Sequence, residues 1–160
     1  MNALPYNEKM ELPKRKYIRL PLEMYANPAH VFSITIDALN RERCFILPEF
    51  NAAVTACLRR LALAKRCPVR IYCLMPTHLH LLMSAGIISV VRWVALFKQT
   101  TEHLATQNGI KRLWQRSFYD HYLRPSENEA ATIGYIRLNP VRAGLVTHPD
   151  DWPWTGSVLL

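Results

Sequence analysis

Residues 68–84, PVRIYCLMPTHLHLLMS, contain two short apolar runs separated by Met75-Pro76-Thr77. Pro68 and the β-branched and aromatic residues that follow it indicate a strand over residues 68–75. A second strand over residues 78–84 begins almost at once. The two strands are therefore expected to be neighbours in a hairpin.

Two helices and one strand flank this pair. Residues 30–36 (HVFSITI) are rich in β-branched and aromatic residues and indicate a strand. Pro48 opens a helical segment that reaches residue 66, with apolar positions recurring at intervals of three and four. Ser89 is expected to cap the next helix, which Asn108-Gly109 ends.

The rest of the chain predicts one more strand and one more helix. Residues 113–123 (LWQRSFYDHYL) favour a strand. Ser126 and Glu129 have the spacing of a capping box, and Pro140 predicts that the helix they begin stops near Asn139. The order β-α-β-β-α-β-α predicts an α+β sandwich of the ferredoxin-like type, an antiparallel sheet with helices on one face.

Three regions are expected along the chain: a basic N-terminal arm (1–27), a catalytic domain (28–146) and a short C-terminal extension (147–160). The arm contains Lys14, Arg15 and Lys16, and such a basic segment is as compatible with exposure to solvent as with binding to DNA. The extension is expected either to pack against the domain as a strap or to contact DNA.

The composition points to a nucleic-acid partner in the cytoplasm. Twenty Lys and Arg against twelve Asp and Glu give a net charge of +8, which attracts a polyanion. The four cysteines form no Cys-x-x-Cys pair, which is typical of reduced thiols in a cytosolic protein. The charged N-terminus argues against export. The lack of about 20 consecutive apolar residues argues against insertion into a membrane.

The histidines of the second strand form a candidate metal site. Residues two apart in a strand share a face, so His78 and His80 are expected side by side, with Leu79 and Leu81 on the other face. A His-x-His pair also arises by chance, about 0.2 times in a chain with six histidines, and such a pair can be purely structural.

The terminal helix carries a second constellation. At 100° per residue, Tyr135 and Asn139 lie on one face, and Ile133 and Ile136 lie on the opposite one. The isoleucines are expected to anchor the helix and leave Tyr135 and Asn139 facing a site. A divalent ion on two imidazoles and an amide oxygen would neutralise a phosphodiester, and a tyrosine would attack it.

Several segments together resemble the REP-associated tyrosine transposases, a branch of the HUH single-tyrosine (IS200-like) transposases. They are YCLMPTHLHLLMS (72–84), LWQRSFYDHYLR (113–124), YIRLNPVRAGLV (135–146) and DWPWTGS (151–157). The resemblance spans roughly residues 28–157. Thr77 departs from it, because members often have Asn, Asp or Glu at this position.

The resemblance implies a metal-dependent enzyme that cleaves and rejoins single-stranded, hairpin-bearing DNA. It makes His78 and His80 metal ligands, Tyr135 the nucleophile that forms a 5'-phosphotyrosine, and Asn139 the third ligand. The ion is Mg²⁺ or Mn²⁺ in the family, and Mn²⁺ suits imidazole better. The family includes monomers and homodimers, and its DNA includes repetitive palindromic elements.

Basic residues around these motifs are candidate DNA contacts, and His121 is a candidate neighbour of the scissile phosphate. They are Arg92, Lys98, Arg116, His121, Arg124, Arg137 and Arg142. Two alternatives remain open: a catalytically inactive, domesticated protein that binds DNA or RNA hairpins, and a metal-dependent hydrolase of small phosphates in which water attacks.

Overall fold

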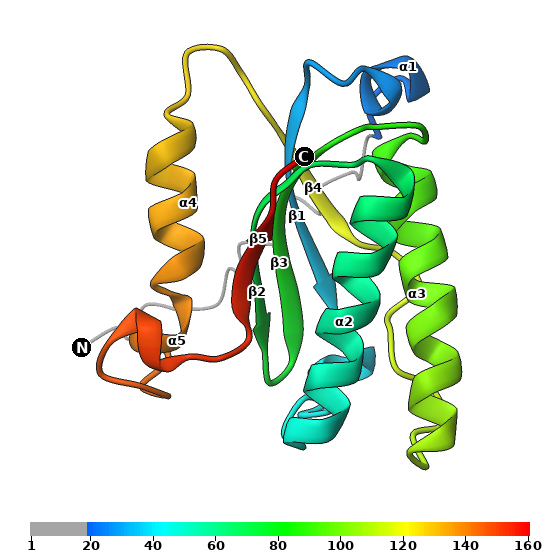
Figure 1. The fold of residues 1–160 in the computed structure, drawn as a ribbon, viewed down its shortest axis with the longest axis vertical. Helices are drawn as coiled ribbons and strands as arrows, with labels where there is room; N and C mark the ends of the chain where they lie inside the picture. Colours follow the sequence, from blue (N-terminus) through cyan, green and yellow to red (C-terminus); the bar gives the residue numbers. More distant parts are fainter. Residues whose placement is uncertain (1–18) are drawn as a thin grey trace, which may run out of the picture.

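The computed structural model describes residues 19–160, which form one antiparallel sheet between two unequal helical layers (Figure 1). The elements, in chain order, are α1 (Leu22–Ala26), β1 (Val31–Asp37), the 3-10 turn η1 (Leu39–Arg41), α2 (Pro48–Lys65), β2 (Val69–Met75), β3 (His78–Ser84), α3 (Val90–Gln107), β4 (Tyr119–Leu123), α4 (Glu129–Arg137), α5 (Asn139–Arg142), the 3-10 turn η2 (Pro149–Asp151) and β5 (Thr155–Val158). The α+β class is confirmed.

The sheet has the strand order β4-β1-β3-β2-β5, with all neighbours antiparallel. The first four strands have the order that a ferredoxin-like chain produces, and β2 and β3 form the expected hairpin. The C-terminal residues add a fifth strand on the free edge of β2 (Figure 1). This pairing occupies backbone groups of β2 that an edge strand would otherwise leave open.

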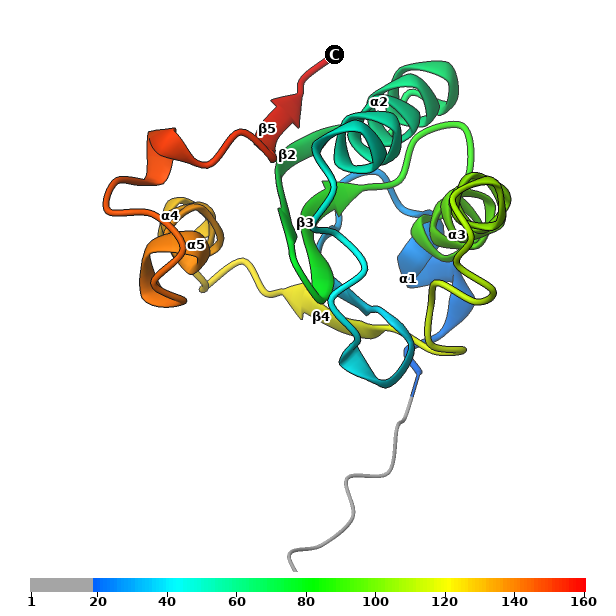
Figure 2. The ribbon, with the colours of Figure 1, turned by 90° about the horizontal axis from the view of Figure 1, so that it is seen from below.

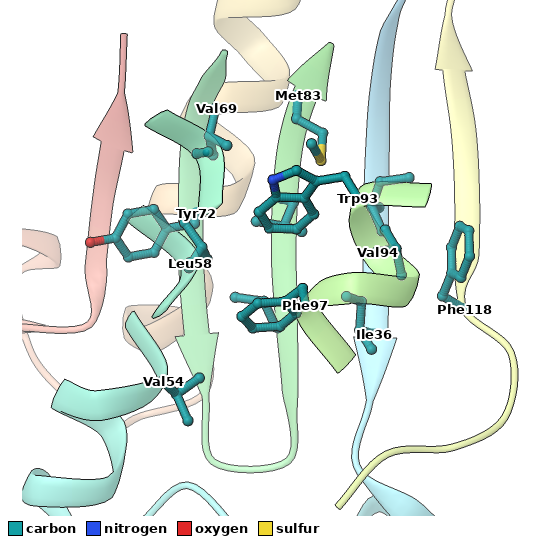
Figure 3. Close-up of a cluster of buried hydrophobic side chains, with 14 of the residues drawn as sticks. Ile36, Val54, Leu58, Val69, Tyr72, Met83, Trp93, Val94, Phe97 and Phe118 are labelled. Atoms are coloured by element: carbon teal, nitrogen blue, oxygen red, sulfur yellow. The ribbon is translucent and has the colours of Figure 1, made fainter. Parts of the chain in front are cut away.

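Helices α1, α2 and α3 cover one face of the sheet, and α4 with α5 lies on the other (Figure 2). The main core lies under α2 and α3, where Leu58, Trp93 and Phe97 pack on Ile36 and Met83 of the sheet (Figure 3). A smaller cluster on the opposite face joins Ile136 of α4 to Cys73, Met75 and Leu82. The helices expected on one face are α2 and α3, whereas α4 packs on the other face, because Ile136 anchors it to this smaller cluster.

Two predicted boundaries differ from the structure. The strand expected from residue 113 begins only at Tyr119, because residues 113–118 form a loop in which Trp114 makes a single bridge to Ala38. The helix cap expected from Ser126 is wrong. Asn128 is the cap, and its side chain accepts a hydrogen bond from the Ala131 amide (3.1 Å).

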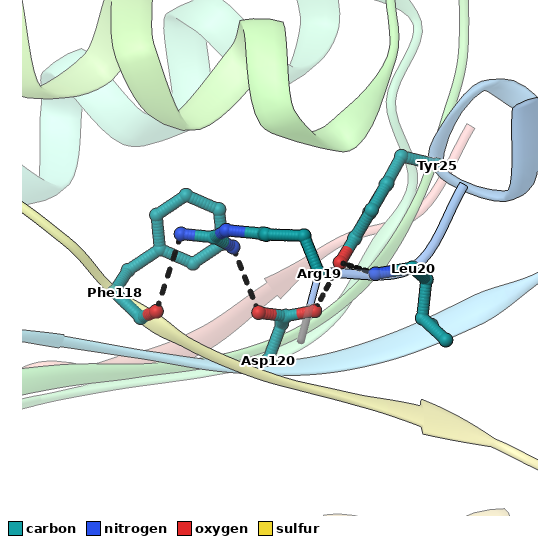
Figure 4. Close-up of polar contacts among 5 residues, drawn as sticks. All are labelled: Arg19, Leu20, Tyr25, Phe118 and Asp120. Atoms are coloured by element: carbon teal, nitrogen blue, oxygen red, sulfur yellow. Dashed lines mark hydrogen bonds and ion pairs between the residues drawn. The ribbon is translucent and has the colours of Figure 1, made fainter. Parts of the chain in front are cut away.

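The segment before β1 is tied to β4 (Figure 4). The Tyr25 hydroxyl donates to Asp120 and accepts from the Leu20 amide (3.3 Å), and Arg19 bonds the second Asp120 oxygen (2.7 Å). Burial raises the pKa of Tyr25, with the Asp120 hydrogen bond as the next cause. Residues 19–26 of the predicted arm thus pack on the domain, while Lys14, Arg15 and Lys16 lie outside the described residues.

None of the helices in residues 19–160 combines the length and apolarity of a membrane-spanning segment.

Candidate metal and nucleophile site

The two histidines of β3 converge on one point. Alternation along the strand buries Leu79 and Leu81 under the helices and turns His78 and His80 to the opposite face. Their rings meet edge to face, with the Nε2 atoms 2.9 Å apart. Two imidazole nitrogens aimed at a common point form an arrangement that a divalent ion can bridge.

Hydroxyl groups hold the far side of each ring. Thr35, opposite His80 in the sheet, has its Oγ1 3.0 Å from the His80 Nδ1. Thr77 has its Oγ1 2.8 Å from the His78 Nδ1. When Nε2 binds an ion, Nδ1 carries the ring proton and donates it to such an oxygen, which fixes the tautomer and the ring orientation.

Both imidazoles are held in the neutral form. Burial is the main cause that lowers the pKa of His80 from the usual 6.5 to about 4, and the positive charge that His78 would carry if protonated, then that of Arg41, act in the same direction. Burial and then Arg41 also lower the pKa of His78. At neutral pH the lone pairs are therefore available to a metal ion without competition from protons.

A charged pair borders the histidines. Asp37 lies opposite His78 in the sheet, is 5% exposed, and its Oδ1 has no hydrogen-bond partner. Arg41 lies 3.7 Å from that oxygen, and its Nη2 lies 3.3 Å from the His78 Nδ1. Within residues 19–160 no group of three or more His, Cys, Asp or Glu side chains is placed to hold a metal ion. A third ligand would therefore be another kind of side chain or a solvent molecule.

Helix α4 presents Tyr135 on the same side of the sheet as the histidines. Ile133 and Ile136 pack against the cluster formed by β2 and β3, as the helical spacing predicts. Tyr135 is 53% exposed, and the Arg142 guanidinium lies over its ring, 4.3 Å from the centroid. An accessible phenol beside a cation suits an anionic substrate.

Asn139 follows α4 directly. Its Nδ2 donates to the carbonyl oxygens of Tyr135 (3.0 Å) and Ile136 (3.2 Å), so the amide caps the end of the helix that carries Tyr135. Because the nitrogen makes both bonds, the amide oxygen stays available as an acceptor or ligand. Pro140 lies in the first turn of α5, so the helix ends near Asn139 as expected and the chain turns into a second helix.

Two candidate DNA contacts lie where β4 leaves the sheet. His121 is exposed on the histidine face of β4 and contacts Glu127 (2.7 Å). The backbone amide of Arg124 bonds the other Glu127 oxygen (2.8 Å), and its side chain is exposed. The Arg124 amide, and then His121, hold the pKa of Glu127 below its usual value.

The other basic candidates are dispersed. Arg137 pairs with Asp150, and this contact lowers the pKa of the carboxyl. Arg92 and Lys98 lie on α3, in the layer over the opposite face of the sheet. Lys98 donates to the carbonyl oxygens of Gln115 and Arg116, and burial lowers its pKa. Among all the basic candidates, the structure places the guanidinium of Arg142 against the Tyr135 ring. Contacts between the basic candidates and DNA stay predictions.

Sequence reasoning missed the neighbours of the histidines. Thr35 and Arg41 reach the rings from β1 and the turn after it, some forty residues earlier in the chain. A known β1–β3 register would have identified Thr35, because residues paired across two strands share a face. Nothing in the sequence identifies Arg41, whose position depends on a left-handed turn.

The fold and this site define the class: a ferredoxin-like sheet with paired histidines on one face and a tyrosine-bearing helix packed over that face. No protein-family model matches the chain. The REP-associated tyrosine transposase of Escherichia coli is 34% identical over 64 residues, which cover 40% of this chain and 36% of that protein. A relative from Haemophilus influenzae with the same family name is 32% identical over 96 residues, which cover 52% of this chain and 54% of that protein.

A solved REP-associated tyrosine transposase bound to a REP hairpin has the same fold. Its TM-score is 0.68 at 19% identity, over 89% of this chain and 82% of that one. The chain spans between about a third and just over half of the length of the curated relatives it matches. The resemblance to the REP-associated tyrosine transposases is confirmed.

Proposed function

We propose that this protein cleaves and rejoins single-stranded, hairpin-bearing DNA through a covalent bond to Tyr135. The observation that carries the proposal is the convergence of the His78 and His80 Nε2 atoms, 2.9 Å apart, on the sheet face over which α4 packs. The relatives named as tyrosine transposases support it, and a hairpin-bound structure with this fold supports hairpin DNA as the substrate.

The residues present fit a divalent ion. His78 and His80 are neutral, their Nδ1 atoms contact hydroxyls, and the Asn139 amide oxygen offers a third ligand of the oxygen type. Imidazole favours Mn²⁺ over Mg²⁺ as the occupant. When bound, the ion would neutralise and orient the phosphodiester that is cut.

The chain's own residues account for the covalent step. The Tyr135 Oη forms a bond to phosphorus while the bond from phosphorus to the 3' oxygen breaks, and the phenol proton passes, overall, to that oxygen. The products are a 5'-phosphotyrosine and a free 3'-hydroxyl. Because one phosphodiester replaces another, attack by a second 3'-hydroxyl rejoins strands without ATP. The Arg142 cation beside the phenol favours the approach of the charged backbone.

The proposal is tested with 5'- and 3'-labelled hairpin-bearing single-stranded DNA and Mn²⁺. We expect a protease-sensitive adduct with the wild type and no adduct with Tyr135→Phe, which retains DNA binding because only one oxygen is lost. Tyr119→Phe is the matched control, since Tyr119 is exposed on the same sheet face.

Two outcomes contradict the proposal. Cleavage that persists in Tyr135→Phe indicates water attack and a hydrolase. Hairpin binding without any cleavage by the wild type indicates a non-catalytic hairpin-binding protein.

A further inference from the structure

A groove outside the histidine site lies at the end of the sheet where β2 turns into β3. Its walls are the segment 39–47, between β1 and α2, and the segment 108–112, after α3. The Leu39 amide donates to the Leu113 carbonyl (2.8 Å) and holds the two segments together. Figure 2 looks onto this end of the molecule. The groove encloses about 580 Å³, within the range of small-ligand sites.

Part of the lining of this groove is apolar. Leu39, Ile46, Leu47 and Ile110 contribute side chains, and Ile46 and Leu47 are 59% and 54% exposed. A flat apolar group that covers these two exposed aliphatic side chains removes them from water, which lowers the free energy.

Three cationic residues also line the groove. Arg43, Lys111 and Arg112 line the groove and are exposed, and within residues 19–160 none of them forms an ion pair. Glu42 is an acidic residue in the same lining. By contrast, Arg137 near Tyr135 is neutralised by Asp150. An apolar lining with a basic rim matches a polynucleotide, which offers base faces and phosphates together.

Arg41 connects this groove to the paired histidines. Asn40 and Arg41 both adopt left-handed backbone angles (φ 53° and 55°), which non-glycine residues rarely do. The turn directs the Arg41 guanidinium to His78, while residues 42–47 continue along the groove. Arg41, which contacts His78, is thus followed directly in the chain by the groove residues Glu42 and Arg43.

We propose that this groove binds the single-stranded DNA that continues from the scissile phosphate, with bases against Ile46 and Leu47 and phosphates along Arg43 and Lys111. The assignment rests on the proposed function, because the histidine pair fixes where the strand enters. An apolar protein segment would also cover Ile46 and Leu47, but the unpaired basic rim favours DNA.

The test compares a bare hairpin with hairpins that carry eight unpaired nucleotides on the 5' or the 3' side. All proteins carry Tyr135→Phe, and dissociation constants are measured without metal over a range of salt concentrations. We expect one of the two flanks to tighten binding. Arg43→Ala with Lys111→Ala should weaken binding of the flanked hairpin about tenfold and leave the affinity for the bare hairpin unchanged. The salt slope should fall by about 1.4, or 0.7 for each lost phosphate contact.

Arg59→Ala with Arg60→Ala, two exposed cations of α2, is the matched control and should keep the full gain. Ile46→Ser with Leu47→Ser should weaken flank binding without changing the salt slope, since no cation is removed. The proposal is overturned if neither flank tightens binding, if the Arg43 and Lys111 variant keeps the full gain, or if the α2 control loses as much. Adduct formation by the Tyr135 protein is scored separately, so failure of strand transfer is distinguishable from failure of the groove.

Discussion

At the residue scale, Thr35 is expected to set how tightly His80 holds a metal ion. Its hydroxyl lies 3.0 Å from the His80 Nδ1 and can accept the proton that the metal-binding tautomer carries there. Thr35→Val keeps the shape of the side chain and removes this acceptor, so we expect Mn²⁺ affinity to fall about tenfold, measured by titration calorimetry.

Ser33→Ala is the control for this substitution. Ser33 lies two positions away on the same face of β1, but it is paired with His121 rather than with His80. Equal Mn²⁺ affinity in the wild type and Thr35→Val, or an equal loss in Ser33→Ala, would show that the hydroxyl does not orient the ring.

The neutral state of His80 predicts how stability depends on pH. The pKa of His80 is lowered to about 4 in the folded protein, against about 6.5 in the unfolded chain. Between these values only the unfolded chain binds the proton, so the metal-free protein should lose stability as the pH falls from 6.5 to 4. The loss attributable to this group is on the order of 2 kcal/mol.

Urea unfolding at pH 7, 5.5 and 4 measures this loss, with His80→Asn as the comparison. The variant should show a shallower fall, since its side chain does not titrate. Parallel curves for the two proteins would mean that the pKa of His80 is the same in the folded protein as in the unfolded chain.

At the scale of elements, Gly134 is expected to soften the helix that carries Tyr135. A Cβ built at Gly134 meets nothing within 4 Å, so Gly134→Ala fits without strain. The substitution should raise the free energy of unfolding by about 0.5–1 kcal/mol and slow hydrogen exchange in α4. If Tyr135 moves to engage DNA, adduct formation should slow while DNA affinity is unchanged.

Ala130→Gly, at an exposed position of the same helix, makes the reverse change and should accelerate exchange. Unchanged exchange in α4 of Gly134→Ala would exclude the glycine as a source of mobility.

The elements could largely be predicted from the sequence, and the contacts between them could not. Alternation placed His78 and His80 on one face, and helical spacing placed Ile133 and Ile136 against the sheet. The pairing of Thr35 with His80 depends on strand register, which local patterns do not encode. Asn128 replaced Ser126 as the cap because several residues in this turn are able to cap a helix.

At the scale of the whole molecule, the two faces of the sheet differ. The face under α2 and α3 carries the main apolar core, and the face under α4 carries the smaller cluster together with the histidines, Tyr135 and Arg142. The C-terminal residues, for which the sequence fits either a packed strap or a DNA contact, complete the edge of the sheet through Val158 and Gly156, which pair with β2. Short edge strands give little local pattern, so β5 was not predicted.

Mapping the site of covalent attachment shows whether Tyr135 is the residue that becomes bound to DNA. The wild-type protein is incubated with hairpin-bearing single-stranded DNA and Mn²⁺, the adduct is digested with protease and nuclease, and the modified peptide is identified by mass spectrometry. We predict a nucleotide linked through its 5'-phosphate to Tyr135. Attachment at Tyr119 or another residue, or cleaved DNA with no modified peptide, would show that Tyr135 is not the nucleophile.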